Sequence, residues 1–216
     1  MFSFLSLLDP PEPPKITGYR EGEKLTGGVA HRLVCTAQGG HPLATLRWFH
    51  RDTELYSEYT AGESQASALL LLTPNRTDNG ALYRCVASSR AITAESAAAA
   101  SSLEVSVRLA VRYAPAGVHI ELRPARLREG TEAVLTCESG EAAPAADIVW
   151  LVNGAPRTGE VTRTAGSYGG EVTTSRLRFT VKAEDDGSVF TCQAANSVGE
   201  ALDAATLSIA CEFLLL

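Results

Sequence analysis

Apolar and polar residues alternate in short runs along most of the chain. Val29, Leu33 and Cys35 share one parity, while Arg32 and Thr36 take the other. The same alternation recurs in later segments, namely residues 46–48, 83–88, 103–108, 135–137, 148–152, 177–182 and 190–194. Successive side chains of a β-strand point to opposite faces of a sheet, so this period predicts half-buried antiparallel strands.

Turn-forming residues separate these runs and fix where the strands end. Glycine pairs stand at residues 39–40 and 169–170, and Asn153-Gly154 is typical of a tight hairpin. The alanine run at residues 97–100 is flanked by serines, so we interpret it as a loop rather than a helix. Many short strands separated by turns favour an all-β sandwich.

One order of residues occurs twice along the chain. Cys35 is followed 13 residues later by Trp48, and Cys137 is followed 13 residues later by Trp150. Each half then carries Asp-x-Gly and ends on aromatic-x-Cys. The matching residues are Asp78, Gly80, Tyr83 and Cys85 in the first half and Asp185, Gly187, Phe190 and Cys192 in the second. In immunoglobulin-like domains such cysteines face each other across two sheets, with the tryptophan packed beside them. The repeat therefore predicts two tandem immunoglobulin-like β-sandwich domains of the I/C2 type.

The length of the chain agrees with two such domains. It has 216 residues, and one sandwich of this type needs about 100. The boundary falls near Val111, because Pro115 then begins a new edge strand, a position that proline tolerates. We assign residues 14–111 to the first domain and 112–210 to the second. Residues 1–13 are expected to be a disordered or non-native segment, and residues 211–216 a truncated tail.

The cysteines predict the redox environment of the protein. Four of the five fall into two pairs, so we expect the disulfides Cys35–Cys85 and Cys137–Cys192 and an oxidising compartment. Cys211 lies in the tail, and we interpret it as a stray thiol rather than an interchain partner. The apolar ends are too short to be a complete signal peptide or a membrane span.

Two further residues near the cysteines are expected to have structural roles. Tyr83 stands two residues before Cys85, the position of a tyrosine corner, in which the hydroxyl donates to nearby backbone. Phe190 occupies the matching position of the second domain and cannot form this bond.

Composition and motifs exclude several classes of function. The net charge of -6 argues against nucleic acid, whose phosphates require basic patches. No C-x-x-C pair, H-E-x-x-H, phosphate-binding loop or G-x-S-x-G motif occurs. We interpret the acidic residues 184–186 as a solvated turn rather than a calcium site, because no second acidic cluster accompanies them. We therefore expect no catalytic residue, metal, cofactor or small-molecule substrate, and hence no enzyme.

The triplet Asn75-Arg76-Thr77 fits the acceptor pattern for N-glycosylation. It lies just before the Asp-x-Gly turn of the first domain, where we expect it to be exposed. The sequence therefore predicts a glycan on Asn75.

The strands that carry the tryptophans also present outward residues. These are Arg47, Phe49 and Arg51 in the first domain and Val149 and Leu151 in the second. Exposed apolar side chains beside arginine are typical of protein interfaces. Single apolar residues are also common on ordinary surfaces. Both readings of these faces stay open at the level of sequence.

Residues 39–48 read Gly-Gly-His-Pro-Leu-Ala-Thr-Leu-Arg-Trp, and Pro13-Pro14 precede them. Together with residues 78–85, this stretch resembles the third Ig domain of the nephrin family of adhesion receptors. The second half resembles the domain that follows, mainly through the general Ig pattern that includes residues 195–199. The resemblance spans residues 13–210.

This resemblance implies a membrane receptor on the extracellular face of the plasma membrane, at cell–cell junctions. Its partners would be protein: a second copy or Neph/kirre-like Ig receptors. The chain contains neither the membrane-distal domains nor the transmembrane segment of that family, so membrane association would come from a segment absent from this chain. The alternative is a secreted ligand-binding Ig protein or a purely structural spacer.

Overall fold

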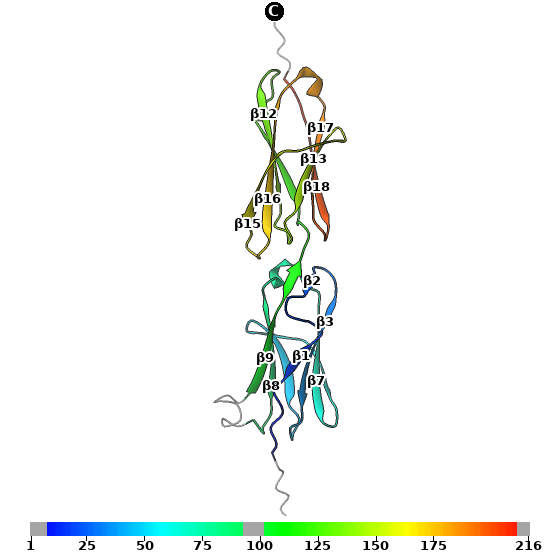
Figure 1. The fold of residues 1–216 in the computed structure, drawn as a ribbon, viewed down its shortest axis with the longest axis vertical. Helices are drawn as coiled ribbons and strands as arrows, with labels where there is room; N and C mark the ends of the chain where they lie inside the picture. The colour runs from blue at the N-terminus through cyan, green and yellow to red at the C-terminus, as the bar shows by residue number, and fades with distance from the viewer. Residues whose placement is uncertain (1–7, 93–101, 211–216) are drawn as a thin grey trace, which may run out of the picture. The chain divides into compact units, whose positions relative to one another are not determined.

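The computed structural model describes residues 8–92 and 102–210, and the chain divides into two compact units, Met1–Val111 and Arg112–Leu216. The described part of each unit folds into two packed β-sheets (Figure 1). The predicted all-β class with tandem immunoglobulin-like sandwiches is confirmed. The alanine run at residues 97–100, the tail with Cys211 and residues 1–7 lie outside the described residues.

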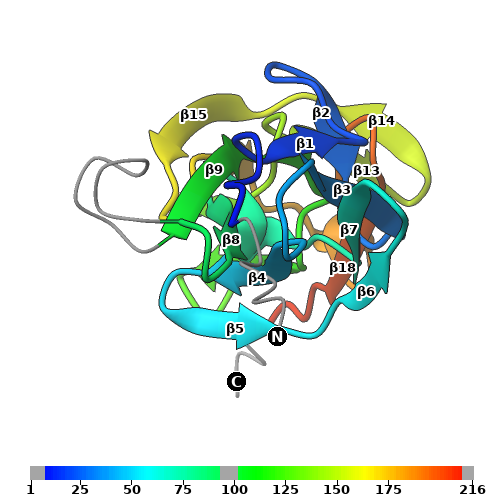
Figure 2. The ribbon, with the colours of Figure 1, turned by 90° about the horizontal axis from the view of Figure 1, so that it is seen from below.

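The first domain contains two four-stranded sheets and one short strand pair. The first sheet has the order β1 (Lys15–Thr17), β3 (His31–Gln38), β7 (Gln65–Leu72) and β6 (Glu58–Ala61). The second has the order β5 (Thr53–Leu55), β4 (Thr45–His50), β8 (Leu82–Ser88) and β9 (Ser102–Arg108). In addition, β2 (Lys24–Thr26) pairs with β10 (Ala110–Arg112), and the 3₁₀ turn η1 (Arg76–Asp78) joins β7 to β8. Figure 2 looks along this domain and shows the two layers.

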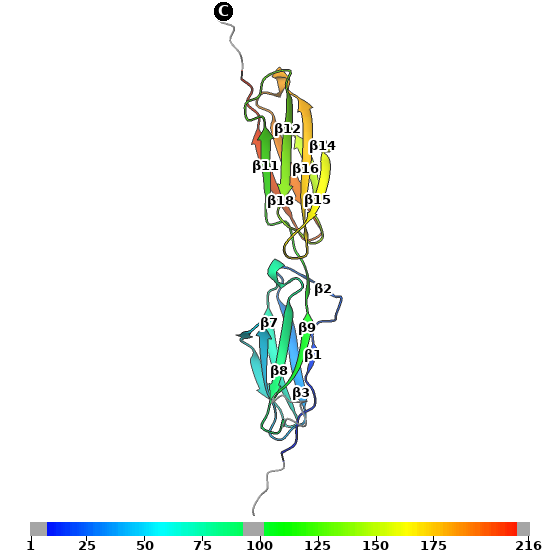
Figure 3. The same ribbon diagram turned by 90° about the vertical axis from the view of Figure 1, so that its left-hand side faces the viewer.

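The second domain repeats this plan. Its first sheet has the order β11 (Val118–Arg123), β12 (Glu132–Ser139), β16 (Glu171–Thr180) and β15 (Glu160–Ala165), which lie side by side in Figure 3. Its second sheet has the order β14 (Ala155–Arg157), β13 (Asp147–Val152), β17 (Val189–Ala195) and β18 (Glu200–Thr206). The 3₁₀ turn η2 (Ala183–Asp185) precedes β17.

Burial follows the alternation in the sequence with one early exception. Along β3, Leu33 and Cys35 are fully buried while Arg32 is exposed. Val29, which the parity placed inward, is 57% exposed. Its backbone N–H donates to Thr26 O at 3.2 Å in a turn, so the strand starts only afterwards, at His31.

A disulfide and an indole fill the centre of each sandwich. Cys35 bonds to Cys85 and Cys137 to Cys192, each with a Cα–Cα distance of 6.4 Å. Both tryptophans, Trp48 and Trp150, are fully buried. Their indole N–H groups donate across the core, to Ala68 O at 3.0 Å and to Ser175 Oγ at 3.1 Å respectively. Each indole is thus tied to the opposite sheet by a hydrogen bond as well as by packing.

Tyr83 does not form the predicted bond to backbone. Its hydroxyl donates instead to Asp78 Oδ1 at 2.8 Å, while Asp78 Oδ2 accepts from the backbone N–H of Asn75 at 2.8 Å. Both carboxylate oxygens of this buried aspartate are therefore occupied. Burial raises the pKa of Tyr83, and the hydrogen bond and charge of Asp78 raise it further. In the second domain Phe190 stacks on Phe179, with ring centroids 5.2 Å apart.

The described part of the N-terminal segment is attached to the first domain. Asp9 and His41 exchange two backbone hydrogen bonds of 3.1 and 2.7 Å, and Glu12 N–H donates to Gln38 O at 2.8 Å. Pro11 is buried against Gly40, where an added Cβ would lie 3.1 Å from its ring. The assignment of residues 8–13 to a disordered or non-native segment is corrected accordingly, because backbone pairing extends over them.

Removing one disulfide should destabilise its own domain. The double variant Cys137→Ala/Cys192→Ala reopens a separation of 55 residues. Because the bridge restricts the unfolded chain, we expect the free energy of unfolding of the second domain to fall by about 4 kcal/mol. Guanidinium titration in a Trp48→Phe background measures this through the fluorescence of Trp150. A loss below about 1 kcal/mol would contradict the chain-entropy account.

The two aromatic positions before the second cysteines offer a reciprocal pair of variants. Tyr83→Phe leaves Asp78 Oδ1 buried without its donor, and we expect a loss of about 2 kcal/mol in the first domain. Phe190→Tyr creates a hydroxyl five residues after Asp185, matching the spacing of Tyr83 and Asp78, and should be neutral or gain about 1 kcal/mol. Chemical denaturation of both variants tests this. A loss of several kcal/mol in Phe190→Tyr would mean that the pocket cannot take the hydroxyl.

Candidate interaction surface

The outward side of the sheet β5-β4-β8-β9 gathers an aromatic ring and four charges. Phe49 on β4 lies opposite Glu54 on β5 and Arg84 on β8. Two residues away on β4, exposed Arg47 forms an ion pair of 3.6 Å with Glu54. Arg84 pairs with Glu104 of β9 at 3.0 Å. These five residues are called the first-domain face below.

Both arginines of the first-domain face also contact the ring. The guanidinium carbons of Arg47 and Arg84 lie 6.0 and 5.5 Å from the centroid of Phe49. A cation over an aromatic face is attracted by the ring quadrupole. The half-buried ring is therefore flanked by two cations, each balanced by one carboxylate. Exposed ion pairs of this kind contribute only about 0–1 kcal/mol, so a docking protein can exchange them at little cost.

Arg51, which the sequence grouped with Arg47 and Phe49, is not part of this face. It follows the end of β4 in the turn to β5, with φ of 54°. The strand parity does not continue through this left-handed position. The structure thus separates Arg51 from the two residues that it brings together, Arg47 and Phe49.

The corresponding side of the second domain carries several exposed or half-buried apolar residues among polar ones. Val149 on β13 is 43% exposed, and Leu202 on β18 is 57% exposed. Both lie in one row, on either side of Gln193. Leu151 lies half-buried in the next row, opposite Thr191. With Val189, which is 40% exposed, the residues Val149, Leu151 and Leu202 form what is called the second-domain face below.

Leu202 was missed by sequence reasoning. Its strand alternates Ala201, Asp203 and Ala205 with Leu202 and Ala204, and a hydrophobicity pattern would place the leucine inward. The structure places it outward, because Asp203 turns inward and its Oδ2 accepts from Ile120 N–H at 2.9 Å. Only the neighbouring strand β11 supplies this donor, so the local sequence carries no signal for it.

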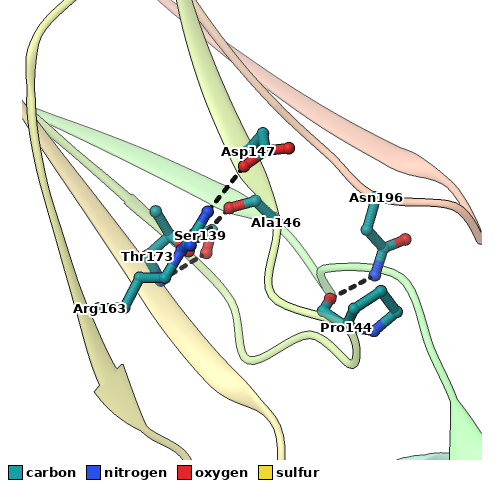
Figure 4. A network of polar contacts seen from close by, with 7 residues as sticks. All are labelled: Ser139, Pro144, Ala146, Asp147, Arg163, Thr173 and Asn196. Carbon is teal, nitrogen blue, oxygen red and sulfur yellow. Dashed lines mark hydrogen bonds and ion pairs between the residues drawn. The ribbon is translucent and has the colours of Figure 1, made fainter.

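A polar network in the second domain surrounds the start of β13 (Figure 4). Buried Thr173 donates its hydroxyl to Ala146 O at 2.8 Å and its N–H to Ser139 Oγ at 3.1 Å. Arg163 and Asp147 form an ion pair of 2.7 Å on the exposed side of the network. Because buried polar groups that are paired in this way rigidify their surroundings, the network should hold the start of β13, the strand that carries Val149 and Leu151.

The carboxylate of Glu141 organises the loop between β15 and β16. Its Oε1 accepts from the Tyr113 hydroxyl at 2.7 Å and from the backbone N–H groups of Tyr168 and Gly170 at 2.8 and 2.9 Å, and its Oε2 accepts from Ser167 N–H at 2.8 Å. Partial burial alone would raise the pKa of Glu141, but these hydrogen bonds outweigh it and hold the pKa below its usual value.

Other kinds of site have no support in residues 8–92 and 102–210. No group of three or more histidine, cysteine or acidic side chains is placed there to hold a metal ion. The described helices are all too short or too polar to cross a lipid bilayer. Asn75, the predicted glycan acceptor, is exposed at the start of η1.

Known proteins with similar sequences are adhesion molecules. Residues 118–201 match the family model of the CD80-like C2-set immunoglobulin domain. The chain is 30% identical to nephrin of Homo sapiens over 195 residues, which cover 88% of this chain and 15% of nephrin. It is 26% identical to Kin of IRRE-like protein 2 of Homo sapiens, over 95% of this chain and 27% of that protein. Identity to Cell adhesion molecule 2 of Xenopus tropicalis is also 26%, over 92% of this chain and 44% of that protein.

Solved structures agree on the fold. The full ectodomain of mouse nectin-like molecule 4 superposes with a TM-score of 0.58 at 24% identity, covering 94% of this chain and 65% of that one. Rst D1-D2 superposes with a TM-score of 0.57 at 20% identity, covering 92% of this chain and 100% of that one. Two tandem sandwiches, each with its own buried disulfide and indole, have the architecture of immunoglobulin-like domains. The sequence is nephrin-like over most of its length, so the predicted resemblance to the nephrin family is confirmed. The chain spans less than half the length of each of these curated relatives.

The acid stability of the second domain should depend on Glu141. Because its folded-state pKa is lowered, the carboxylate stabilises the fold above its ordinary pKa of about 4.3, and this contribution is lost as pH falls through the folded value. Glu141→Gln should therefore lower the melting temperature at pH 7, and the difference from the unaltered protein should shrink towards pH 3. Calorimetry across this range measures it, with Glu160→Gln on exposed β15 as the control. A difference that is constant with pH would refute the role of the charge.

Proposed function

We propose that the chain is an extracellular segment of a nephrin-like cell–cell adhesion receptor and acts by protein–protein recognition. The observation that carries the proposal is the first-domain face, where Phe49 lies between two arginines that are each balanced by a carboxylate. Aromatic residues and arginine are enriched in the centres of protein interfaces. The proposal assigns recognition, not catalysis, to the chain.

The balance of charge on this face favours another Ig receptor as partner, either a second copy or a Neph/kirre-like protein. Across the sheet β5-β4-β8-β9 the two glutamates lie on the outer strands, β5 and β9, and the two arginines on the inner strands, β4 and β8. A face that carries both signs in equal number can meet a copy of itself without like charges being forced together. The names of the relatives, nephrin and Kin of IRRE-like protein 2, support this class of partner.

The disulfides support an extracellular location of the chain. Bridges of this kind persist in oxidising environments such as the cell surface. We therefore place the segment on the extracellular side of the plasma membrane, at contacts between cells.

A spacer role is the second candidate, and one observation favours it. Each charged side chain of the first-domain face is already paired within the domain, which is what a solvated, non-binding surface also requires. In that case the two sandwiches would only set the distance between recognition domains elsewhere in a longer receptor.

Bead aggregation separates the two candidates. Beads coated with the purified chain should aggregate, alone or with beads that carry Kin of IRRE-like protein 2. Phe49→Asp should weaken binding at least tenfold, because it removes a central aromatic anchor, and Leu202→Asp should do the same if the second-domain face takes part. Leu71→Asp is the matched control, since Leu71 is 56% exposed on β7, in the opposite sheet.

Melting curves of the three variants establish that each remains folded. Beads of the unaltered chain that stay dispersed in both settings would favour the spacer. Equal loss of binding in Phe49→Asp and Leu71→Asp would show that the first-domain face has no special role.

A further inference from the structure

Asn75 is held in a defined position by its neighbours. Pro74 before it is fully buried, and its carbonyl accepts from Gly28 N–H at 2.8 Å. Asn75 itself has extended backbone angles and is the N-cap of η1. Its backbone N–H donates to Asp78 Oδ2 at 2.8 Å. The backbone at Pro74 and Asn75 is thus held by hydrogen bonds within the domain.

The side-chain amide of Asn75 uses only its oxygen within the fold. Oδ1 accepts from the backbone N–H of Thr77 and from the Thr77 hydroxyl, both at 2.7 Å. The amide group is planar, so Nδ2 lies on the other side of Cγ from these two donors. Within the described residues no hydrogen bond uses Nδ2. Asn75, Arg76 and Thr77 are all exposed.

The other asparagines lack the acceptor pattern, and two of them use the amide nitrogen within the fold. The chain has three more, Asn79, Asn153 and Asn196, and none is followed two positions later by serine or threonine. Asn153 Nδ2 donates to Ser188 Oγ at 3.2 Å, and Asn196 Nδ2 donates to two backbone carbonyls at 2.8 Å. The amide nitrogens of Asn153 and Asn196 thus have partners within the fold, whereas no hydrogen bond among the described residues uses that of exposed Asn75.

We propose that Asn75 has two roles at once, in which Oδ1 caps the turn while Nδ2 carries the one N-linked glycan of this chain. The two roles are compatible because N-glycosylation leaves Oδ1 and one N–H of the amide in place. The cap in turn restrains the side chain from which the glycan projects. This proposal goes beyond the adhesive function and does not depend on it.

The chemistry requires an oligosaccharide donor linked through pyrophosphate to a lipid. The bond between the first sugar carbon and the phosphate oxygen breaks, and the bond from that carbon to Nδ2 forms. The lipid pyrophosphate leaves, and one amide proton passes to the transferase. This reaction belongs to the secretory pathway, where the disulfides of the chain also form.

The acceptor lies outside the strands of both sheets of the first domain. η1 joins β7 of one sheet to β8 of the other, so Asn75 lies in the connection between the two layers. The residues of the first-domain face lie within β4, β5, β8 and β9 instead. A glycan at this turn is thus attached outside the strands that form that face.

The first test is occupancy. The full chain is secreted from animal cells behind an added signal peptide and treated with peptide N-glycosidase. We expect the unaltered chain and Thr77→Ser to lose the mass of one glycan, and Asn75→Asp and Thr77→Ala to lose none. Material that is secreted and disulfide-bonded, yet keeps its mass after treatment, would overturn the glycan assignment.

The second test is the cap. Asn75→Asp keeps an oxygen at the capping position, whereas Asn75→Ala keeps neither cap nor acceptor. Compared in unglycosylated protein, Asn75→Ala should melt about 4 °C below Asn75→Asp. The glycosidase also converts the modified asparagine to aspartate, so the enzyme-treated chain should have the same melting temperature as Asn75→Asp. Equal melting of Asn75→Ala and Asn75→Asp would overturn the capping role and leave the glycan result to stand alone.

Discussion

Each domain depends on one arrangement, a disulfide that crosses two sheets with an indole packed beside it. The bridge and the tryptophan occupy the space where both sheets present small or apolar side chains. A domain of this size has a net stability of only about 5–15 kcal/mol, so a bridge worth about 4 kcal/mol is a large share of it. The same arrangement decides which parity of each strand faces inward, and hence which side chains remain outside.

The turn before the second cysteine is built alike in both domains but completed differently. Asp78 and Asp185 each accept a backbone N–H three residues before them, from Asn75 and Lys182. In the first domain a tyrosine hydroxyl adds to this, while the second domain stacks two phenylalanine rings. Elsewhere in the second domain, buried hydroxyl groups form hydrogen bonds: Ser175 Oγ accepts from the Trp150 indole, and the Thr173 hydroxyl donates to Ala146 O. Two solutions, one polar and one aromatic, therefore stabilise the same corner of the fold.

The outward faces differ in a way that bears on function. The first-domain face combines a ring, two cations and two anions, whereas the second-domain face is made of valine and leucine. Electrostatic complementarity mainly gives specificity and speed of association, and apolar contact gives affinity. The two faces therefore offer different kinds of contact, and the turn at Asn75 lies outside the strands that form the first of them.

The sequence alone determined the class of fold, because alternation, the cysteine spacing and the repeated tryptophan are all local or short-period signals. It also singled out Phe49, Val149 and the acceptor triplet at Asn75. Tertiary structure decided which of these residues act together. Arg51 does not lie on the first-domain face, because a left-handed turn residue ends the alternation of the strand there. Leu202 lies on the second-domain face because Asp203, its neighbour, points inward and accepts a hydrogen bond from Ile120 N–H on β11. Glu54 lies opposite Phe49 within one hairpin, but Arg84 and its partner Glu104 reach this face only because β8 pairs with β4 and β9 with β8. These strands are far apart along the chain, so no single stretch of sequence contains this constraint.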